Sequence, residues 1–327
     1  MLAVIHEKAN KTGLLAIQDI NKPQINDNEV LIRVAYAGVN RPDLLQRYGH
    51  YPPPIGHSSI MGLEVSGWID EVGENVYGLT KGQTVFALTN GGGYAEYCAV
   101  PAGQCLVLPP GISLEESAAI PETFFTAWHN LIERGMLQPG KDILIHGSGG
   151  GVSSASIQLA RFMGARVFCT AGSINKAQFA ERLGAVLALN YHEQNFDRLK
   201  ENTLNRNGFD LILDMIGTTY FQQNIQLLAP EGRLVQIATQ QGSKVEFDLR
   251  QLLVKRITLT GSTLRAQSNE VKSRIAAKFF QATQQAFVLR QLRPFIQQIF
   301  PLTEVDKAHQ LMQEGQLMGK LILKIIA

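Results

Sequence analysis

Hydrophobic and polar residues follow two different patterns along the chain. Over about the first 110 residues, short apolar stretches alternate with turns, and glycine is frequent between them. This pattern predicts short strands in an all-β body of barrel type. The strands are expected at Leu2–Ile5, Leu14–Ile17, Glu29–Val39, Glu64–Val76, Gln83–Ala87 and Tyr94–Val100.

From Asp142 onward, apolar strands alternate with amphipathic helices. The strands are expected at Ile143–His146, Arg166–Thr170, Val186–Asn190, Asp210–Met215, Arg233–Ala238 and Ile257–Gly261. Helices are expected from about Gly151, over Ile174–Leu183, up to about Leu204, and over Tyr220–Leu228. Such alternation predicts an α/β unit, a parallel sheet covered by helices on both faces, whose ligand binds at the carboxyl ends of the strands.

The segments on either side of this unit predict a domain boundary and a return of the chain. Ser113 and Glu116 have the spacing of a capping box, and a helical run over Ala118–Leu131 follows them. Beyond Arg265 we expect a helix over Asn269–Leu289, an extended segment at Pro294–Phe300, a helix over Val305–Gln313 and a strand at Lys320–Ile326. The last strand is expected to rejoin the first domain.

A glycine-rich turn lies between the first strand of the α/β unit and its helix. An apolar run at Ile143–Ile145 precedes the small residues Gly147–Gly151. The strict G-x-G-x-x-G pattern is broken, because Ser148 and Ser153 occupy its outer positions, yet a small residue stands at every crowded point. Such a turn lets the backbone approach a pyrophosphate at a helix N-terminus, so we predict a dinucleotide site. A plain glycine loop is the alternative.

The end of the second strand indicates which dinucleotide is bound. NAD-type folds place an acidic side chain there, against the ribose hydroxyl. Residues 167–176 contain no acid, and they offer instead the Ser173 hydroxyl and the Lys176 ammonium, which suit a 2′-phosphate. We therefore favour NADPH as the cofactor. In the alternative interpretation, Ser173 caps the helix and Lys176 is a solvated surface residue.

Composition excludes several other classes of protein. With 327 residues the chain suits about two domains, and 30 Lys plus Arg against 28 Asp plus Glu leave a net charge of +2, which gives no reason to expect nucleic acid or an acidic membrane as a partner. The three cysteines are scattered, which fits a reducing compartment. No signal peptide or membrane-spanning stretch is evident. We expect a cytoplasmic protein.

Several motifs, in this order over essentially the whole chain, resemble the quinone oxidoreductase (zeta-crystallin-like) family of the medium-chain dehydrogenases and reductases. They are Gly38–Asp43, Arg47-x-Gly49-x-Tyr51-Pro52, Gly62–Glu64, Gly93–Tyr97, Pro121–Thr123 with Thr126–Trp128, and Asp214-x-Ile216-Gly217. The spacing of Gly49–Pro54 before Gly62–Glu64 is most similar to the branch that contains the tumour-suppressor-inducible quinone oxidoreductase.

This resemblance implies a fold and a set of cofactor contacts. The fold is a GroES-like β-barrel domain, over 1–122 and 266–327, joined to a Rossmann domain over 123–265, with the active site in the cleft between them. Ser153 replaces the family's usual glycine, which bears on how closely the helix approaches the phosphate. The contacts with NADPH map onto Thr126, Gly150, Gly151, Val152, Ser173, Lys176, Tyr191, Gly217, Thr263, Leu264 and Arg265.

Zinc alcohol dehydrogenases of this superfamily carry a cysteine and a histidine where this chain has Asn40 and Leu63. Neither side chain suits catalytic zinc, and a four-cysteine site is impossible with three cysteines, so we predict no metal. Without a metal ion as Lewis acid, oxidation of an alcohol is disfavoured, whereas hydride transfer to an acceptor that is already electrophilic needs no metal. As a hypothesis, Asn40 and Tyr51 polarise the acceptor's oxygen, and the alternative for Tyr51 is an ordinary loop tyrosine.

Three further groups have structural interpretations beside functional ones. Arg41 and Asp43 suit either contact with substrate or an ion pair within their loop. His146 suits a packed and hydrogen-bonded histidine better than a general base, and Glu115–Glu116 suit a capping box at a helix start better than acid/base catalysis.

The function predicted is an NADPH-dependent quinone reductase. An enone or 2-alkenal reductase is the enzymatic alternative. A non-catalytic RNA-binding role, known among zeta-crystallin relatives, is the other, although the near-neutral charge argues against it. The family also implies a homodimer or a tetramer, with the apolar run Ile257–Thr260 as a candidate edge strand.

Overall fold

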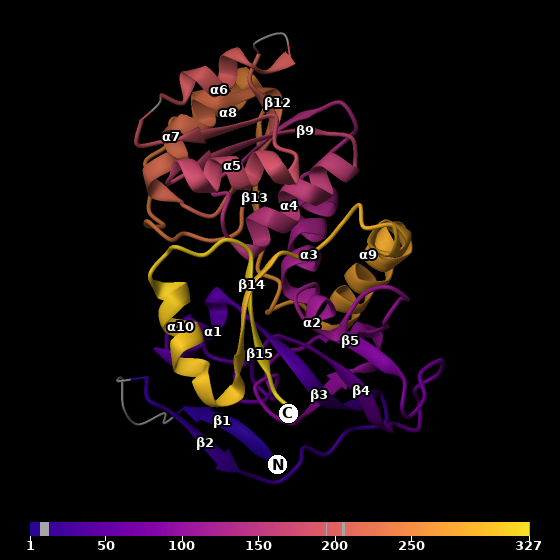
Figure 1. The fold of residues 1–327 in the computed structure, drawn as a ribbon. Coiled ribbons are helices and arrows are strands. Elements are labelled where there is room, and N and C mark those ends of the chain that lie inside the picture. Colours follow the sequence, from indigo (N-terminus) through magenta and orange to yellow (C-terminus); the bar gives the residue numbers. More distant parts are fainter. Residues whose placement is uncertain (7–12, 194, 205–206, 327) are drawn as a thin grey trace. The chain divides into compact units, whose positions relative to one another are not determined.

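The computed structural model describes residues 1–6, 13–193, 195–204 and 207–326. The chain forms two compact units (Figure 1). Unit 1 comprises Met1–Phe125 and Leu264–Ala327, and unit 2 comprises Thr126–Thr263. The domain boundaries predicted after residues 122 and 265 lie within a few residues of these limits.

Unit 1 is built on a sheet that combines strands from the N-terminal part of the chain with the two strands nearest its C-terminus. Its strand order is β14-β15-β3-β4-β5-β7, and β6 also pairs with β3. The final strand β15 runs antiparallel to β3, with Leu321 opposite Val39, so the predicted return of the chain is confirmed. The strands are β3 (Glu29–Val39), β4 (Glu64–Val72), β5 (Thr84–Leu88), β6 (Tyr97–Pro101), β7 (Cys105–Val107), β14 (Ile296–Pro301) and β15 (Lys320–Lys324), with β1 (Leu2–His6) and β2 (Leu15–Asp19) in a separate antiparallel pair.

The helices of unit 1 include one that the strand pattern missed. Helix α1 (Arg41–Arg47) lies where only strands and turns were predicted, with Asn40 preceding it and Pro42 in its first turn. Proline suits a helix start because the N–H it lacks has no partner within the helix there. The capping box of Ser113 and Glu116 is confirmed. The other helices are α2 (Leu114–Ser117), α3 (Pro121–Trp128, which ends in unit 2), α9 (Asn269–Val288), α10 (Val305–Gln313) and the short 3₁₀ turns Ala102–Gln104 and Leu302–Glu304.

Unit 2 has the predicted parallel sheet. Its strand order is β10-β9-β8-β11-β12-β13, and each neighbouring pair is parallel. The first strand, β8, lies between β9 and β11, so the chain reverses its direction of winding there, and such a switch point is where doubly wound sheets bind ligands. The strands are β8 (Asp142–Ile145), β9 (Arg166–Ala171), β10 (Leu187–Asn190), β11 (Phe209–Asp214), β12 (Leu228–Gln236) and β13 (Thr258–Gly261).

Most helices of unit 2 were also predicted. Helix α5 has the predicted bounds, whereas α8 was missed because it has only seven residues and none of them is buried. The helices are α4 (Gly151–Phe162), α5 (Ile174–Leu183), α6 (Asp197–Glu201), α7 (Thr218–Leu227) and α8 (Leu249–Lys255), together with the π-helical segment His129–Arg134. None of the helices among the described residues has the length and apolar character needed to cross a bilayer.

The central strands of unit 2 are apolar because they are covered on both sides. Leu144, Phe168 and Ile212, from three neighbouring strands, are fully buried in one cluster. Each such side chain contributes about 1.5–3 kcal/mol by its removal from water. This rigid core fixes the strand ends at which the candidate site lies.

Candidate active site

The glycine turn follows β8 and leads directly into α4. Gly147 has a φ of 83°, a left-handed conformation that favours glycine, and Gly150 is the N-cap residue of the helix. The helix begins at Gly151, as predicted. The first N–H groups of a helix lack partners within it, so Gly151 and Val152 are positioned to meet a phosphate.

Ser153 fits the position where the family has glycine. It is buried, and its hydroxyl lies 3.8 Å from the Met215 sulfur. A Cβ built at Gly147 would lie 3.3 Å from the same hydroxyl. The absence of a side chain at Gly147 therefore leaves the room that Ser153 takes, and the turn still packs closely against α4.

Three of the predicted cofactor contacts follow the carboxyl ends of the neighbouring strands β9 and β10. The Ser173 hydroxyl accepts a hydrogen bond from the Lys176 backbone N–H at 3.3 Å, which caps α5. Tyr191 follows β10, and its hydroxyl lies 2.7 Å from a Cβ built at Gly172. Burial lowers the pKa of Lys176, so its ammonium is partly withdrawn from water. The segments that follow β9 and β10 thus supply a hydroxyl, an ammonium and a phenol, and residues 167–176 contain no acid of the kind that an NAD-binding unit carries there.

A second glycine turn follows β11. Gly217 has a φ of 94°, and a Cβ there would lie 2.2 Å from the Gly242 carbonyl oxygen. The Asp214 carboxylate accepts hydrogen bonds from the backbone N–H groups of Ile216 at 2.6 Å and of Gly217 at 3.3 Å. Only glycine fits this position, and the Asp214 carboxylate holds the backbone of the turn in place.

The remaining predicted cofactor contacts fall in both units. Thr126 lies on α3, where its carbonyl accepts a hydrogen bond from the Asn130 amide, and Thr263 is the last residue of unit 2. Leu264 and Arg265 belong to unit 1, although the prediction placed them in the Rossmann domain. Their contact with a cofactor stays a prediction.

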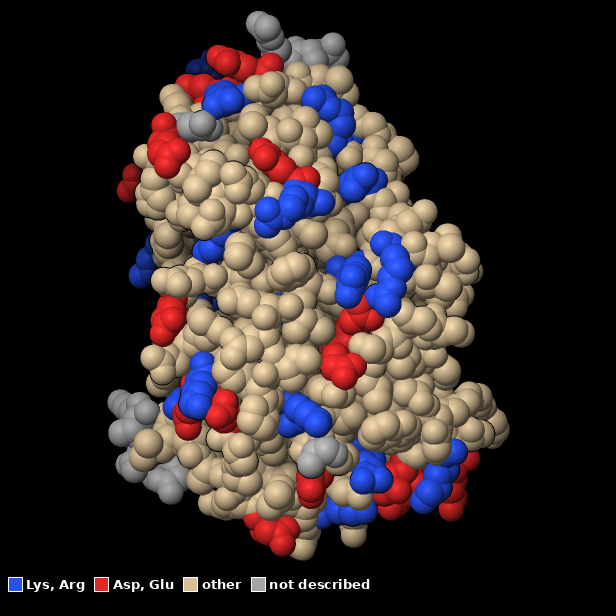
Figure 2. Space-filling view, in the orientation of Figure 1, with Lys and Arg blue, Asp and Glu red and all other residues tan. Residues whose placement is uncertain are grey.

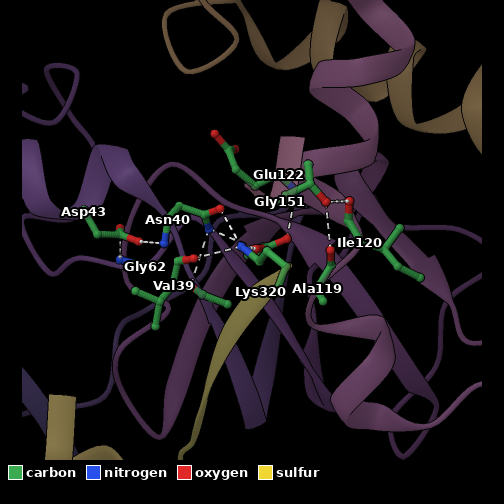
Figure 3. A network of polar contacts seen from close by, with 12 residues as sticks. Val39, Asn40, Asp43, Gly62, Ala119, Ile120, Glu122, Gly151 and Lys320 are labelled. Carbon is green, nitrogen blue, oxygen red and sulfur yellow. Dashed lines mark hydrogen bonds and ion pairs between the residues drawn. The ribbon is translucent and has the colours of Figure 1, made fainter. Parts of the chain in front are cut away.

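In unit 1, Asn40 lies in a buried polar network (Figure 3). The Lys320 ammonium contacts the Asn40 amide oxygen at 2.6 Å, the Glu64 carboxylate at 2.6 Å and the Val39 carbonyl at 2.9 Å. The Asn40 amide nitrogen donates to Glu64 at 2.9 Å. Both ends of the amide are therefore used within the protein, and the predicted contact of Asn40 with an acceptor stays a prediction.

Two carboxyl groups near this network hold protons unusually tightly. Burial, followed by the charge of Glu64, raises the pKa of Glu122 to about 8. Burial also raises the pKa of Asp43 to about 6, although hydrogen bonds from Asn40 N–H, Gly62 N–H and the Tyr94 hydroxyl oppose the rise. Through these hydrogen bonds, Asp43 connects the start of α1 at Asn40 with the loop that contains Gly62. Among the described residues no ion pair joins it to Arg41, so that interpretation is wrong.

Tyr51 lies beside a buried cation. The Arg265 guanidinium is 5.3 Å from the centre of the Tyr51 ring and donates to the Tyr51 carbonyl at 3.3 Å. It also donates to the Gln46 side chain at 2.7 Å and to the Asn90 carbonyl at 3.1 Å, and it is buried. Burial raises the pKa of Tyr51, so its hydroxyl is protonated at neutral pH. A half-buried donor next to a fixed positive charge can stabilise an oxygen that becomes negative.

Two protein-family profiles and several known proteins are similar to this chain. The profile of the alcohol dehydrogenase GroES-like domain matches residues 26–110, and that of the zinc-binding dehydrogenase matches residues 151–281. The quinone oxidoreductase of Sus scrofa is 31% identical over 310 residues, which cover 93% of this chain and 92% of that protein. The chain belongs to the quinone oxidoreductase family of the medium-chain dehydrogenases and reductases. The predicted family and fold class are confirmed, while the proposed branch within the family stays a prediction.

Solved structures of family members agree with the fold. The quinone oxidoreductase from Thermus thermophilus, reported also as its complex with NADPH, is 29% identical, with a TM-score of 0.83 over 99% of this chain and 100% of its own. The CurK enoyl reductase is 26% identical, with a TM-score of 0.85 over 99% of each chain. The same scaffold is thus shared by proteins described as acting on quinones and on enoyl groups.

The positions that hold zinc ligands in related dehydrogenases have other uses in this family member. Asn40 is engaged with Glu64 and Lys320, and Leu63 is a buried apolar residue. No group of three or more His, Cys, Asp or Glu side chains suited to a metal ion occurs among the described residues.

Several residues around the site were not found from the sequence. Lys320 and His309 come from the far end of the chain, and no local pattern marks them. His309 Nε2 lies 3.3 Å from the Tyr94 hydroxyl, and burial lowers the pKa of His309 to about 3. Lys272 is buried against Asn90 and the Arg265 carbonyl, and no local pattern distinguishes it from the exposed lysines of the chain.

Proposed function

We propose that this protein reduces quinones with NADPH, by hydride transfer that needs no metal. The observation that carries the proposal is the placement of Ser173, Lys176 and Tyr191 after the carboxyl ends of the neighbouring strands β9 and β10, with no acid at the end of β9. The relatives described as quinone oxidoreductases, one of them with NADPH bound, support it.

The residues present fit the cofactor. At Gly217 a Cβ would collide with the backbone of the loop above it. The buried Ser148 hydroxyl in the first turn has no hydrogen-bond partner in the described part of the chain, so it is available to a ligand. Gly150, Gly151 and Val152 would bind the pyrophosphate, while Ser173, Lys176 and Tyr191 would bind the 2′-phosphate. NADPH, when bound, supplies the hydride.

Tyr51 and Arg265 act on the acceptor in this proposal. A quinone gains a hydride and one proton and becomes a hydroquinone, and its oxygen turns negative before the proton arrives. The Tyr51 hydroxyl donates a hydrogen bond to that oxygen and can transfer its proton. The Arg265 guanidinium stabilises the negative charge that then lies on the tyrosine or on the oxygen.

The acceptor decides between two related activities. Likeness to the CurK enoyl reductase favours an enone or 2-alkenal as the second candidate, because hydride addition to a polarised double bond uses the same donor and the same hydrogen bond. Binding of RNA is not proposed. On the face shown in Figure 2, positive and negative side chains are interspersed, without the basic stripe that nucleic acid requires.

We further propose a homodimer formed through the edge of unit 2. β13 is an edge strand, and the neighbouring α8 exposes Leu249, Leu253 and Val254 by 67%, 73% and 65%. An apolar helix face beside an open strand suits pairing of two copies into one continuous sheet. We place the protein in the cytoplasm, which its three buried, unpaired cysteines support.

The test is turnover by chelator-treated protein with 1,2-naphthoquinone, 1,4-benzoquinone or trans-2-hexenal, followed by loss of the reduced cofactor. We expect quinone reduction with NADPH. Lys176→Ala is expected to raise the KM for NADPH by about 10- to 100-fold, the effect of losing a charged hydrogen bond. Lys141→Ala is the matched control and should behave as wild type. It removes an exposed lysine that is paired with Asp210 and precedes β8, whereas the glycine turn follows β8.

Other outcomes would change the assignment. Turnover of the enal alone would transfer it to the second candidate. If Tyr51→Phe reduced quinone at the wild-type rate, Tyr51 would have no role in the chemistry. If no acceptor reacts while NADPH binds, the dinucleotide site stands and the quinone assignment fails.

A further inference from the structure

A continuous series of hydrogen bonds connects the glycine turn after β8 with the glycine turn after β11, and His146 is at its centre. On one side, the Gly147 backbone N–H donates to the Thr170 hydroxyl at 3.1 Å. The same hydroxyl lies 3.2 Å from His146 Nδ1. This half of the series joins the glycine turn after β8 to the end of β9.

The other half reaches the turn after β11. His146 Nε2 lies 2.6 Å from the Asn224 amide oxygen, and the Asn224 amide nitrogen donates to the Asp214 carboxylate at 3.0 Å. Asp214 in turn accepts the backbone N–H groups of Ile216 and Gly217. The two turns predicted to face the dinucleotide are thus connected through four side chains, each at most 1% exposed.

The Asp214 carboxylate fixes the direction of the hydrogen bonds that connect it to His146. A carboxylate only accepts, so the Asn224 amide nitrogen donates to Asp214 and its oxygen accepts from His146 Nε2–H. Burial lowers the pKa of His146, which favours the neutral imidazole. With Nε2 protonated, Nδ1 of the neutral ring carries no proton and accepts from the Thr170 hydroxyl, whose oxygen accepts from the Gly147 backbone N–H.

We propose that Thr170 and His146 are positioning residues, which hold the Gly147 and Gly217 turns in the relative placement that a pyrophosphate requires. This inference rests on the proposed binding of NADPH. This positioning role is separate from the packing of the His146 ring. The ring packs against Tyr220, at 4.8 Å between ring centres, and against Phe196, at 6.1 Å. Packing orients the ring, and the hydrogen bonds connect it to both turns.

Thr170→Val tests this with little change of shape. Valine keeps the volume and branching of threonine but removes the hydroxyl, so Gly147 N–H and His146 Nδ1 lose their partner. Thr170→Ser restores the hydroxyl. Thr203→Val is a matched control in the same unit, because the Thr203 hydroxyl also accepts a backbone N–H, from Gly208 at 3.3 Å, and donates to the Lys200 carbonyl at 2.7 Å.

Binding is measured by calorimetry with two probes. NADPH contains the pyrophosphate, whereas 2′-AMP contains only the adenosine half and its 2′-phosphate. We expect Thr170→Val to weaken NADPH about tenfold, as loss of about 1.4 kcal/mol does, and to leave 2′-AMP binding and the KM for quinone unchanged. Thr170→Ser should bind NADPH as wild type does, and so should Thr203→Val.

Three results would overturn the inference. Wild-type affinity of Thr170→Val for NADPH would show that the series of hydrogen bonds does not position the turns. Equal weakening by Thr203→Val, or parallel loss of NADPH and 2′-AMP, would show general destabilisation of unit 2. Failure of the wild-type protein to bind NADPH is a distinct result, which removes the proposed function and this inference together.

Discussion

Replacing Lys320 by methionine is expected to destabilise unit 1 strongly. The Lys320 side chain is 4% exposed and its partner Glu64 is fully buried, with 2.6 Å between ammonium and carboxylate. Methionine retains most of the apolar stem, so the cavity left behind is small. The change therefore removes the buried positive charge together with its hydrogen bonds to the Asn40 amide oxygen and the Val39 carbonyl.

The magnitude follows from what Glu64 retains. Removal of one partner from a buried ion pair costs about 3–5 kcal/mol, because the other charge stays buried without compensation. Glu64 still accepts from the Asn40 amide at 2.9 Å and from the Glu122 backbone N–H at 2.9 Å. These two bonds place the expected loss near the lower end, at about 3 kcal/mol.

Denaturant unfolding monitored by tryptophan fluorescence measures this loss. Trp68 belongs to unit 1 and Trp128 to unit 2, so a Trp128→Phe background makes Trp68 the reporter. Lys307→Met removes an exposed lysine paired with Glu304 and should cost less than about 0.5 kcal/mol. The double change Lys320→Met with Glu64→Gln removes both charges and should recover more than half of the loss. If Lys320→Met costs no more than Lys307→Met, the reasoning about the buried pair is wrong.

Three further predictions concern pH, cysteine reactivity and association. Because Glu122 has a pKa of about 8 in the folded chain and an ordinary value near 4.5 when unfolded, stability should fall as pH rises between these values, and Glu122→Gln should flatten that slope in unfolding measured across pH. Burial raises the pKa of Cys98 and Cys105 to about 12 and raises that of Cys169 further. A thiol reagent should therefore label none of the three cysteines until the protein unfolds. Rapid labelling of the native protein would contradict their buried positions. Leu253→Glu should convert the proposed dimer to a monomer in light scattering without loss of NADPH binding, whereas an unchanged mass would exclude the α8 face as the interface.

The sequence predicted those parts of the fold that local patterns determine. Helix α5 and helix α10 have the predicted bounds, because an apolar face recurs with helical spacing between clear ends. Helices α1 and α8 were missed because each has only seven residues, too few for that spacing to be recognised. β3 was predicted correctly from end to end, since its core positions are consistently apolar.

The candidate site could be predicted only in part, for the same physical reason. The glycine turn lies in the strand–turn–helix segment formed by β8 and α4, and Ser173 and Lys176 lie in the next one, formed by β9 and α5, so the arrangement within each segment follows from local structure. The partners of Asn40 do not, because Lys320 is 280 positions away and reaches it through the pairing of β15 with β3. His146 was recognised as a packed and hydrogen-bonded residue, but its partners Thr170 and Asn224 become visible only when the parallel strands are placed side by side.

We propose that unit 2 selects NADPH over NADH for the reduction of quinones. The ratio of kcat/KM for NADPH to kcat/KM for NADH, with metal-free protein and 1,2-naphthoquinone as the acceptor, measures this selection. We predict a ratio of about tenfold or more in favour of NADPH, the value of at least one good hydrogen bond to the 2′-phosphate. A ratio near one, or a preference for NADH, would contradict the account.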